Sequence, residues 1–195
     1  MKKQICVYLL CFISISIFSQ KSYLQISEKE AVESITQKLT CQDKEIYPLL
    51  QDHFEKFLLK NKFANNKVNI CEGYYNYLIE IVENGGEIGT IKKDKAFKRL
   101  KKCINCSGHN IDSENIFIFL YATYKPIVEK YHSNLLEENN ENEWIYLAGT
   151  ISPNSEDYEI NLHLTIQAIV EKYTSQDFNR EILKQFVILL VLAKI

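Results

Sequence analysis

The sequence Phe186-Val187-Ile188-Leu189-Leu190-Val191-Leu192-Ala193, near the end of the 195-residue chain, is apolar at every position. A helix that is apolar on all sides must be surrounded by other elements, so this stretch predicts a central core helix. A buried β-strand is the competing interpretation of the same run. The stretch is too short to cross a lipid bilayer, which needs about 20 apolar residues.

Helical spacing of apolar residues also recurs along most of the chain before this run. Clean alternation of apolar and polar residues, which is typical of strands, is scarce. The pattern therefore predicts an all-α domain, a bundle of about six helices. Helices are expected near residues 27–40, 43–60, 68–84, 92–102, 114–135, 155–173 and 175–195.

Several residues indicate where these helices begin. Ser27 and Glu30 have the spacing of a capping box, in which the hydroxyl and the carboxylate each accept a hydrogen bond from a free backbone amide. Ser155 is the expected cap of the first C-terminal helix, and Ser175 or Asp177 that of the second.

Glycine and proline indicate where helices end or bend. Gly85 and Gly86 are expected to stop the helix over residues 68–84, because glycine adopts the left-handed cap conformation without strain. Pro126 predicts a kink or a break in the helix over residues 114–135. In the helix over residues 68–84, the expected buried stripe consists of Cys71, Tyr75, Leu78 and Val82.

Residues 1–19 have the form of a secretory signal peptide. Lys2 and Lys3 precede an apolar run from Ile5 to Phe18, after which charged, periodic sequence begins. We expect cleavage to leave a single helical domain, residues 20–195, in the periplasm or outside the cell. An uncleaved membrane anchor is the alternative; after cleavage, no stable membrane span is expected.

The charge balance gives no indication of a nucleic-acid partner. The chain has 23 basic and 25 acidic residues, a formal charge of −2. Removal of Lys2 and Lys3 leaves 21 and 25, a formal charge of −4. A protein is the expected partner.

The exported chain would retain Cys41, Cys71, Cys103 and Cys106. Four cysteines in an oxidising compartment predict disulfides. Cys71 and Cys103 continue the apolar sides of their helices, so both thiols are expected to point into the core. The sequence leaves the connectivity open.

Cys103 and Cys106 are separated by two residues, with His109 three residues further on. This loop supports an alternative hypothesis, a thiol-active or zinc-binding protein. The helix dipole at the end of a helix disfavours a thiolate, although neighbouring lysines favour one. A zinc site would need Cys41 or Cys71 as the fourth ligand.

Other catalytic patterns are missing from the sequence. It contains no Gly-x-Ser-x-Gly elbow, no phosphate-binding loop and no dinucleotide fingerprint. His53, His132 and His163 lack metal-ligand spacing and are interpreted as surface or satisfied core residues. We therefore assign no catalytic residue, no cofactor and no metal ligand, and favour binding over catalysis.

Two groups of residues are candidates for a binding surface. Tyr74, Tyr75 and Tyr77 cluster just after Cys71, and we expect Tyr74 and Tyr75 on one side of the helix and Tyr77 on another, so that at least one phenol is exposed. Exposed tyrosine is a common binding anchor, although the sequence favours plain core packing with a solvated hydroxyl over that role. The basic segment 92–102 contains seven basic residues and one acid; its candidates are Lys92, Lys93, Lys98 and Arg99.

The four residues Cys71-Glu72-Gly73-Tyr74, on an expected helix, resemble the Cys-x-Gly-Tyr element of periplasmic immunity proteins that neutralise effectors of type VI secretion. The resemblance covers these four residues, and the chain is longer than those proteins usually are. It implies stoichiometric inhibition of a toxin enzyme by a disulfide-braced helical surface. Together with the expected export, it favours a binding protein of the immunity or inhibitor type.

Overall fold

The computed structural model describes residues 25–39, 46–105, 115–131, 147 and 162–195. Every regular element in these ranges is helical and none is a strand, which confirms the all-α prediction for this part of the chain. After a first helix over residues 25–39 come α2 (Ile46–Lys60), η1 (Lys67–Asn69), α3 (Ile70–Glu83), η2 (Gly89–Lys93), α4 (Lys95–Asn105), α5 (Asn115–Tyr131), α7 (Leu162–Lys172), η3 (Ser175–Asn179) and α8 (Glu181–Lys194), where η denotes a short 3₁₀ helix.

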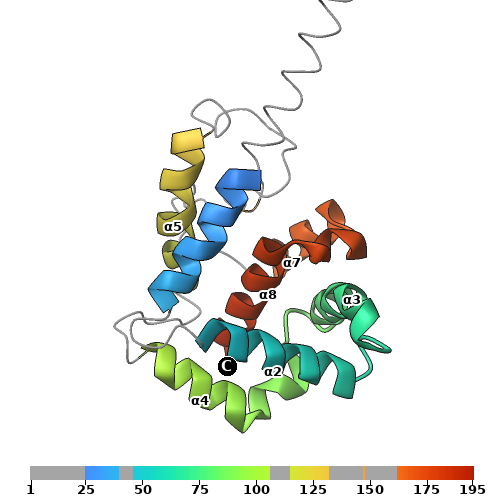
Figure 1. Cartoon of the computed structure of the whole chain (residues 1–195). Coiled ribbons are helices and arrows are strands. Elements are labelled where there is room, and N and C mark those ends of the chain that lie inside the picture. Colours follow the sequence, from blue (N-terminus) through green and yellow to red (C-terminus); the bar gives the residue numbers. More distant parts are fainter. Residues whose placement is uncertain (1–24, 40–45, 106–114, 132–146, 148–161) are drawn as a thin grey trace, which may run out of the picture.

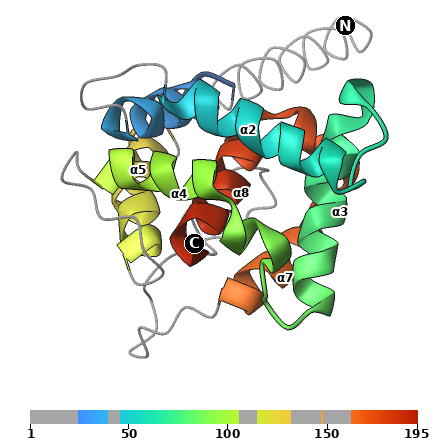
Figure 2. The same ribbon diagram turned by 90° about the horizontal axis from the view of Figure 1, so that it is seen from below.

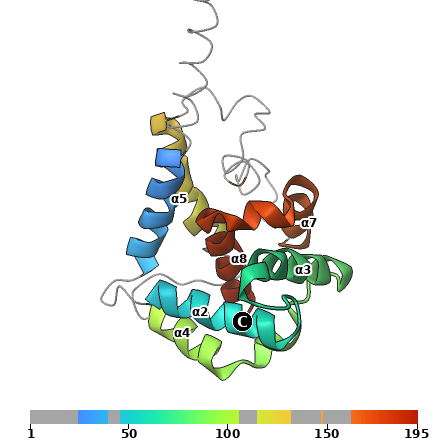
Figure 3. The ribbon, with the colours of Figure 1, turned by 45° about the vertical axis from the view of Figure 1, so that its right-hand side comes forward.

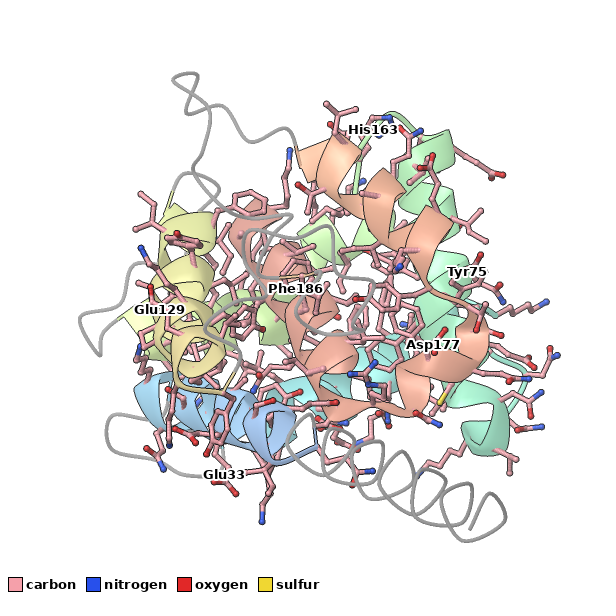
Figure 4. The ribbon with its side chains drawn as sticks, turned by 90° about the horizontal axis from the view of Figure 1, so that it is seen from above. Glu33, Tyr75, Glu129, His163, Asp177 and Phe186 are labelled. Atoms are coloured by element: carbon pink, nitrogen blue, oxygen red, sulfur yellow. The ribbon has the colours of Figure 1, made fainter. Side chains whose placement is uncertain are left out.

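Helix α8 forms the centre of the fold, as the apolar run predicted, and the strand alternative is wrong. Every side chain from Gln185 to Ala193 is buried. In Figure 1, α8 lies between the first helix and α5 on one side and α3 on the other. Figure 4 shows Phe186 in the middle, with Glu33 and Glu129 toward the periphery. Within the described ranges, no helix combines the length and apolarity that crossing a membrane requires.

The single helix predicted over residues 175–195 is two helices, η3 and α8. Arg180 between them has extended backbone, with φ −84° and ψ 129°. Thr174 is the N-cap of η3, and its amide and hydroxyl donate to Asp177 Oδ2 at 2.7 and 2.8 Å. The cap therefore precedes both predicted residues, Ser175 and Asp177. The preceding helix, α7, is described from Leu162, so the predicted cap Ser155 lies outside the described residues.

The first helix and α5 lie side by side (Figures 1 and 3). Ser27 is buried inside the helix, and Glu30 accepts hydrogen bonds from Lys130 Nζ at 2.8 Å and Tyr131 Oη at 2.7 Å. The predicted capping box is therefore wrong, because its carboxylate joins two helices instead. Helix α5 continues through Pro126, so the predicted break is not present.

Helices α2 and α3 agree with their predicted extents where described. The predicted face of α2, with Phe54, Phe57 and Leu58, is buried. Helix α3 ends at the predicted place: Gly85 has φ 64°, and the Gly86 amide donates to the Ile81 carbonyl at 2.8 Å. This arrangement is a glycine-stopped helix end.

Helix α4 lies beside α2 in Figures 1 and 3, and in Figure 2, which is seen from below, it runs alongside α2 on the viewer's side of α8. Its Phe97 and Ile104 are buried. The predicted basic helix is divided, because Lys92 and Lys93 belong to η2 and α4 starts after Asp94. Cys103 lies within α4 and not in a following loop.

Candidate binding surface

The two tyrosines predicted as binding residues are in the core. Tyr74 and Tyr77 are 0% and 1% exposed, so their assignment to a surface is wrong. Tyr77 Oη donates to the Ile88 carbonyl at 2.8 Å, and Tyr74 Oη lies 3.4 Å from Glu55 Oε1. Burial raises the pKa of both phenols, and the Glu55 carboxylate raises that of Tyr74 further. Both side chains are therefore neutral parts of the core.

Helix α3 is rotated relative to the predicted stripe, and its inner face includes a close contact at Gly73. A Cβ atom on Gly73 would lie 2.9 Å from the Ala64 Cβ, closer than Cβ atoms normally approach. Absence of that Cβ lets α3 pack against the α2–α3 connection with Tyr74 and Tyr77 turned inward. Their rings lie 5.2 and 5.5 Å from that of Phe54. Of the predicted stripe, Leu78 is fully buried, and Cys71, Tyr75 and Val82 are partly buried.

Two cations of the basic segment are used within the fold. Lys92 forms an ion pair with Glu87. Lys101 Nζ donates to the Ala193 carbonyl at 3.4 Å, at the C-terminal end of α8. A cation there is favourable because the helix dipole places partial negative charge on the last carbonyls. Lys92, one of the predicted binding residues, is therefore partly neutralised.

The other cations of the segment are exposed and form what we call the basic surface. None of them forms an ion pair with an acid in the part of the chain that the structure describes. Three are predicted residues, Lys93, Lys98 and Arg99, and two were not singled out from the sequence, Lys95 and Lys102. The members of the basic surface are Lys93, Lys95, Lys98, Arg99 and Lys102.

Asp94 fixes the start of α4 and joins it to α2. Its Oδ1 accepts from the Ala96 and Phe97 amides at 2.9 and 3.0 Å, as an N-cap, and lies 3.0 Å from His53 Nε2. Burial alone would raise the pKa of Asp94, but the hydrogen bonds from Phe97, His53 and Ala96 outweigh it and lower the pKa. The only acid of the basic segment is therefore engaged inside the fold.

The histidines do not form a chemical centre in the described residues. His53 is partly buried against Asp94, and its ring centroid lies 5.4 Å from that of Phe97. His163 on α7 is labelled in Figure 4; its Cβ would lie 3.2 Å from a Cβ on Gly86. His132 lies outside the described residues.

Two of the four predicted disulfide cysteines are described, and both are free thiols. Cys71 is partly buried, while Cys103 is exposed, contrary to the expected inward orientation. The pairing of Cys71 with Cys103 is not formed. Cys41, Cys106 and His109 lie outside the described residues. Within the described ranges, no group of three or more potential metal-binding side chains is present.

A polar cluster between α2 and α8 escaped the sequence analysis. Tyr47 Oη donates to Glu181 Oε1 at 2.8 Å, and Gln51 Nε2 lies 3.3 Å from carboxylate oxygens of both Glu55 and Glu181. The two bonds to Glu181 join residues 134 and 130 positions apart in sequence, so no local pattern could have revealed them. The cluster fastens the start of α8 to α2.

Comparison with known proteins found no matching family model, no matching curated protein and no matching solved structure. The resemblance to immunity proteins remains a prediction. The basic surface is therefore the feature from which a function can be inferred.

Proposed function

We propose that this protein is an exported binding protein that acts by stoichiometric binding through the basic surface of α4. The observation that carries the proposal is the set of exposed cations without an acidic partner among the described residues. Such a surface attracts acidic partners and speeds their encounter.

The arrangement of these cations is unfavourable for the isolated fold. Lys95 and Arg99 are four residues apart on α4, as are Lys98 and Lys102. Like charges at this spacing destabilise a helix by about 0.2–0.5 kcal/mol per pair. Carboxylates of a bound partner would remove this repulsion, which supports a binding role over a merely solvated face.

Export and bracing are further parts of the proposal. Cleavage of residues 1–19 would release a bundle of about six helices to the periplasm or the cell exterior. Disulfides would brace it there, each joining Cys71 or Cys103 to Cys41 or Cys106. Each bridge would add about 2–4 kcal/mol to the free energy of unfolding.

More specifically, we propose that the protein is an immunity or inhibitor protein. The Cys-x-Gly-Tyr element would contribute to this role through packing, not through contact with the toxin. Gly73 permits the close contact with Ala64, and Tyr74 fills the core. In this protein, the element would therefore hold the scaffold rigid, while the basic surface of α4 would contact the toxin.

The second candidate function is that of a thiol-active or zinc-binding protein centred on Cys103, Cys106 and His109. The exposure of the Cys103 thiol favours it, since a reactive thiol must be accessible. It predicts dithiol-dependent insulin reduction that disappears in Cys103→Ser, or added mass from bound zinc. Without either, this candidate fails.

Capture of partners by two matched variants tests the binding function. Tagged wild-type protein, Lys98→Glu/Arg99→Glu and the control Lys60→Glu/Lys67→Glu are incubated with native extract. Both variants change the formal charge by −4, and the control residues are exposed outside α4. We expect wild type and control to retain an equimolar protein partner that the α4 variant loses. Equal retention by all three proteins would contradict binding through α4.

A further inference from the structure

We infer that the basic surface binds the acidic face of a helix in a partner protein, with carboxylates repeated every three and four residues. This inference rests on the proposed binding function and specifies the chemistry of the partner. It follows from the spacing of the cations, from the residues between them and from the position of the apolar side of α4.

The cations of α4 form one stripe. Lys95, Lys98, Arg99 and Lys102 follow the spacing i, i+3, i+4, i+7, which places them on one face of the helix over about 10 Å. All four are exposed, whereas Lys101, outside this spacing, turns toward the end of α8. A partner helix with acids at the same spacing would place one carboxylate opposite each cation.

Among the α4 side chains that the structure describes, Lys95 to Ile104, no large apolar one is exposed. Besides the four cations, the exposed residues in this range are Ala96 and Cys103, and both are small. The large exposed hydrophobic residues of the described chain lie on other elements: Ile26, Leu49, Val68, Ile118 and Leu164. Binding at α4 is therefore electrostatic, and the small side chains leave room for close approach.

A lipid surface fits this helix poorly. A helix that lies in a membrane interface inserts its apolar face among the acyl chains. The apolar side of α4 is not available for insertion, because Phe97 and Ile104 are fully buried and Asp94 ties the helix to His53 of α2. Figure 2 shows α4 packed along α2, with its outer side toward the viewer. The observations therefore favour a protein partner over anionic lipid.

Two synthetic helical peptides of identical composition test the inference. One has glutamates at i, i+3, i+4 and i+7 on a single face, and the other has the same glutamates distributed around the helix. Fluorescence anisotropy measures binding of each to the full chain at low and physiological ionic strength. We expect the striped peptide to bind several-fold tighter and to lose affinity as salt rises.

Charge-reversal variants of the protein and anionic lipid vesicles serve as controls for the peptide experiment. Lys98→Glu/Arg99→Glu should weaken binding of the striped peptide about tenfold, and Lys60→Glu/Lys67→Glu should leave it close to wild type. Equal affinity for the two peptides, or equal loss in the two variants, would overturn the inference. Binding to phosphatidylglycerol vesicles that depends on α4, without peptide binding, would also overturn it in favour of a membrane.

Failure of this inference is distinguishable from failure of the proposed function. If an extract protein still binds through α4 while neither peptide does, the binding function holds and the acidic helix is wrong. If no extract protein depends on α4 either, both fail.

Discussion

Helices α3 and α4 each contain residues that were predicted to bind a partner, but these residues are buried on α3 and mostly exposed on α4. The tyrosines of α3 are in the core, while most of the basic residues of α4 are on the surface. Charge places a side chain on the surface almost regardless of its neighbours, because burial of an unpaired charge is costly. An aromatic side chain such as tyrosine can lie in the core or on the surface. Its burial therefore depends on contacts with residues that are distant in the sequence. The following predictions test this contrast.

The largest effect is expected in the core of α3. Tyr77→Ala removes a ring that contacts Phe54, Phe57 and Phe63, and should lower the free energy of unfolding by about 3–5 kcal/mol. Tyr77→Phe keeps the ring and should cost about 1–3 kcal/mol, because the Ile88 carbonyl loses its donor. Urea unfolding measures both. A loss below about 0.5 kcal/mol in Tyr77→Ala would place this residue on the surface after all.

Gly73→Ala is expected to have the next largest effect. Alanine favours helix over glycine by about 1 kcal/mol, but overpacking against Ala64 costs about 1–3 kcal/mol, so a net loss is expected. The double variant Gly73→Ala/Ala64→Gly tests the cause, since it removes the Cβ that would lie 2.9 Å away. The two substitutions should therefore be less destabilising together than their separate effects predict. Strict additivity in urea unfolding would refute the contact as the cause.

Asp94, which caps the start of α4 and joins it to His53 of α2, is expected to have a pH-dependent effect. Asp94→Ala should cost about 1 kcal/mol through loss of the N-cap. The pKa of Asp94 is lowered in the folded state, so its charge stabilises the protein above about pH 4, and this contribution is lost as the pH falls through the folded pKa. Asp94→Asn retains the cap but not the charge. Its deficit in unfolding free energy should therefore be largest well above about pH 4 and shrink as the pH falls below that value; a deficit independent of pH would contradict a role for the charge.

The smallest effect on stability is expected on the surface of α4. Lys98→Glu/Arg99→Glu should raise the free energy of unfolding by up to about 1 kcal/mol, because it removes two like-charge pairs at four-residue spacing, Lys95 with Arg99 and Lys98 with Lys102. Differential scanning calorimetry gives the comparison with Tyr77→Ala. Destabilisation by several kcal/mol would show that these cations support the fold and not a partner.

Much of the helical layout could be predicted from local patterns. The apolar run of α8, the buried face of α2 and the glycine stop after α3 all follow from short-range chemistry, and the structure confirms them. The capping box at Ser27 failed because Glu30 has partners 100 and 101 residues away. Local patterns thus predict where helices form better than they predict which side chains join them.

Only part of the candidate surface could be predicted, because the sequence does not show which cations have partners elsewhere in the fold. The density of lysine and arginine identified the segment, but not that Lys92 binds Glu87 or that Lys101 binds the end of α8. The buried residues of α3, Tyr74, Tyr77, Leu78 and Ile81, have helical spacing in the sequence, but so does the predicted stripe. Periodicity alone could not choose between the two faces, because the contact between Gly73 and Ala64 is not a local pattern.

Lysine acetylation, measured by mass spectrometry with and without the striped acidic peptide, tests whether the basic surface is where the partner binds. In the free protein, Lys95, Lys98 and Lys102 of α4 and Lys60 of α2 should all react, because all are exposed. With the peptide bound, we expect protection of the three α4 lysines while Lys60 keeps its rate. Equal protection of Lys60, or unchanged rates on α4, would contradict binding through the basic surface.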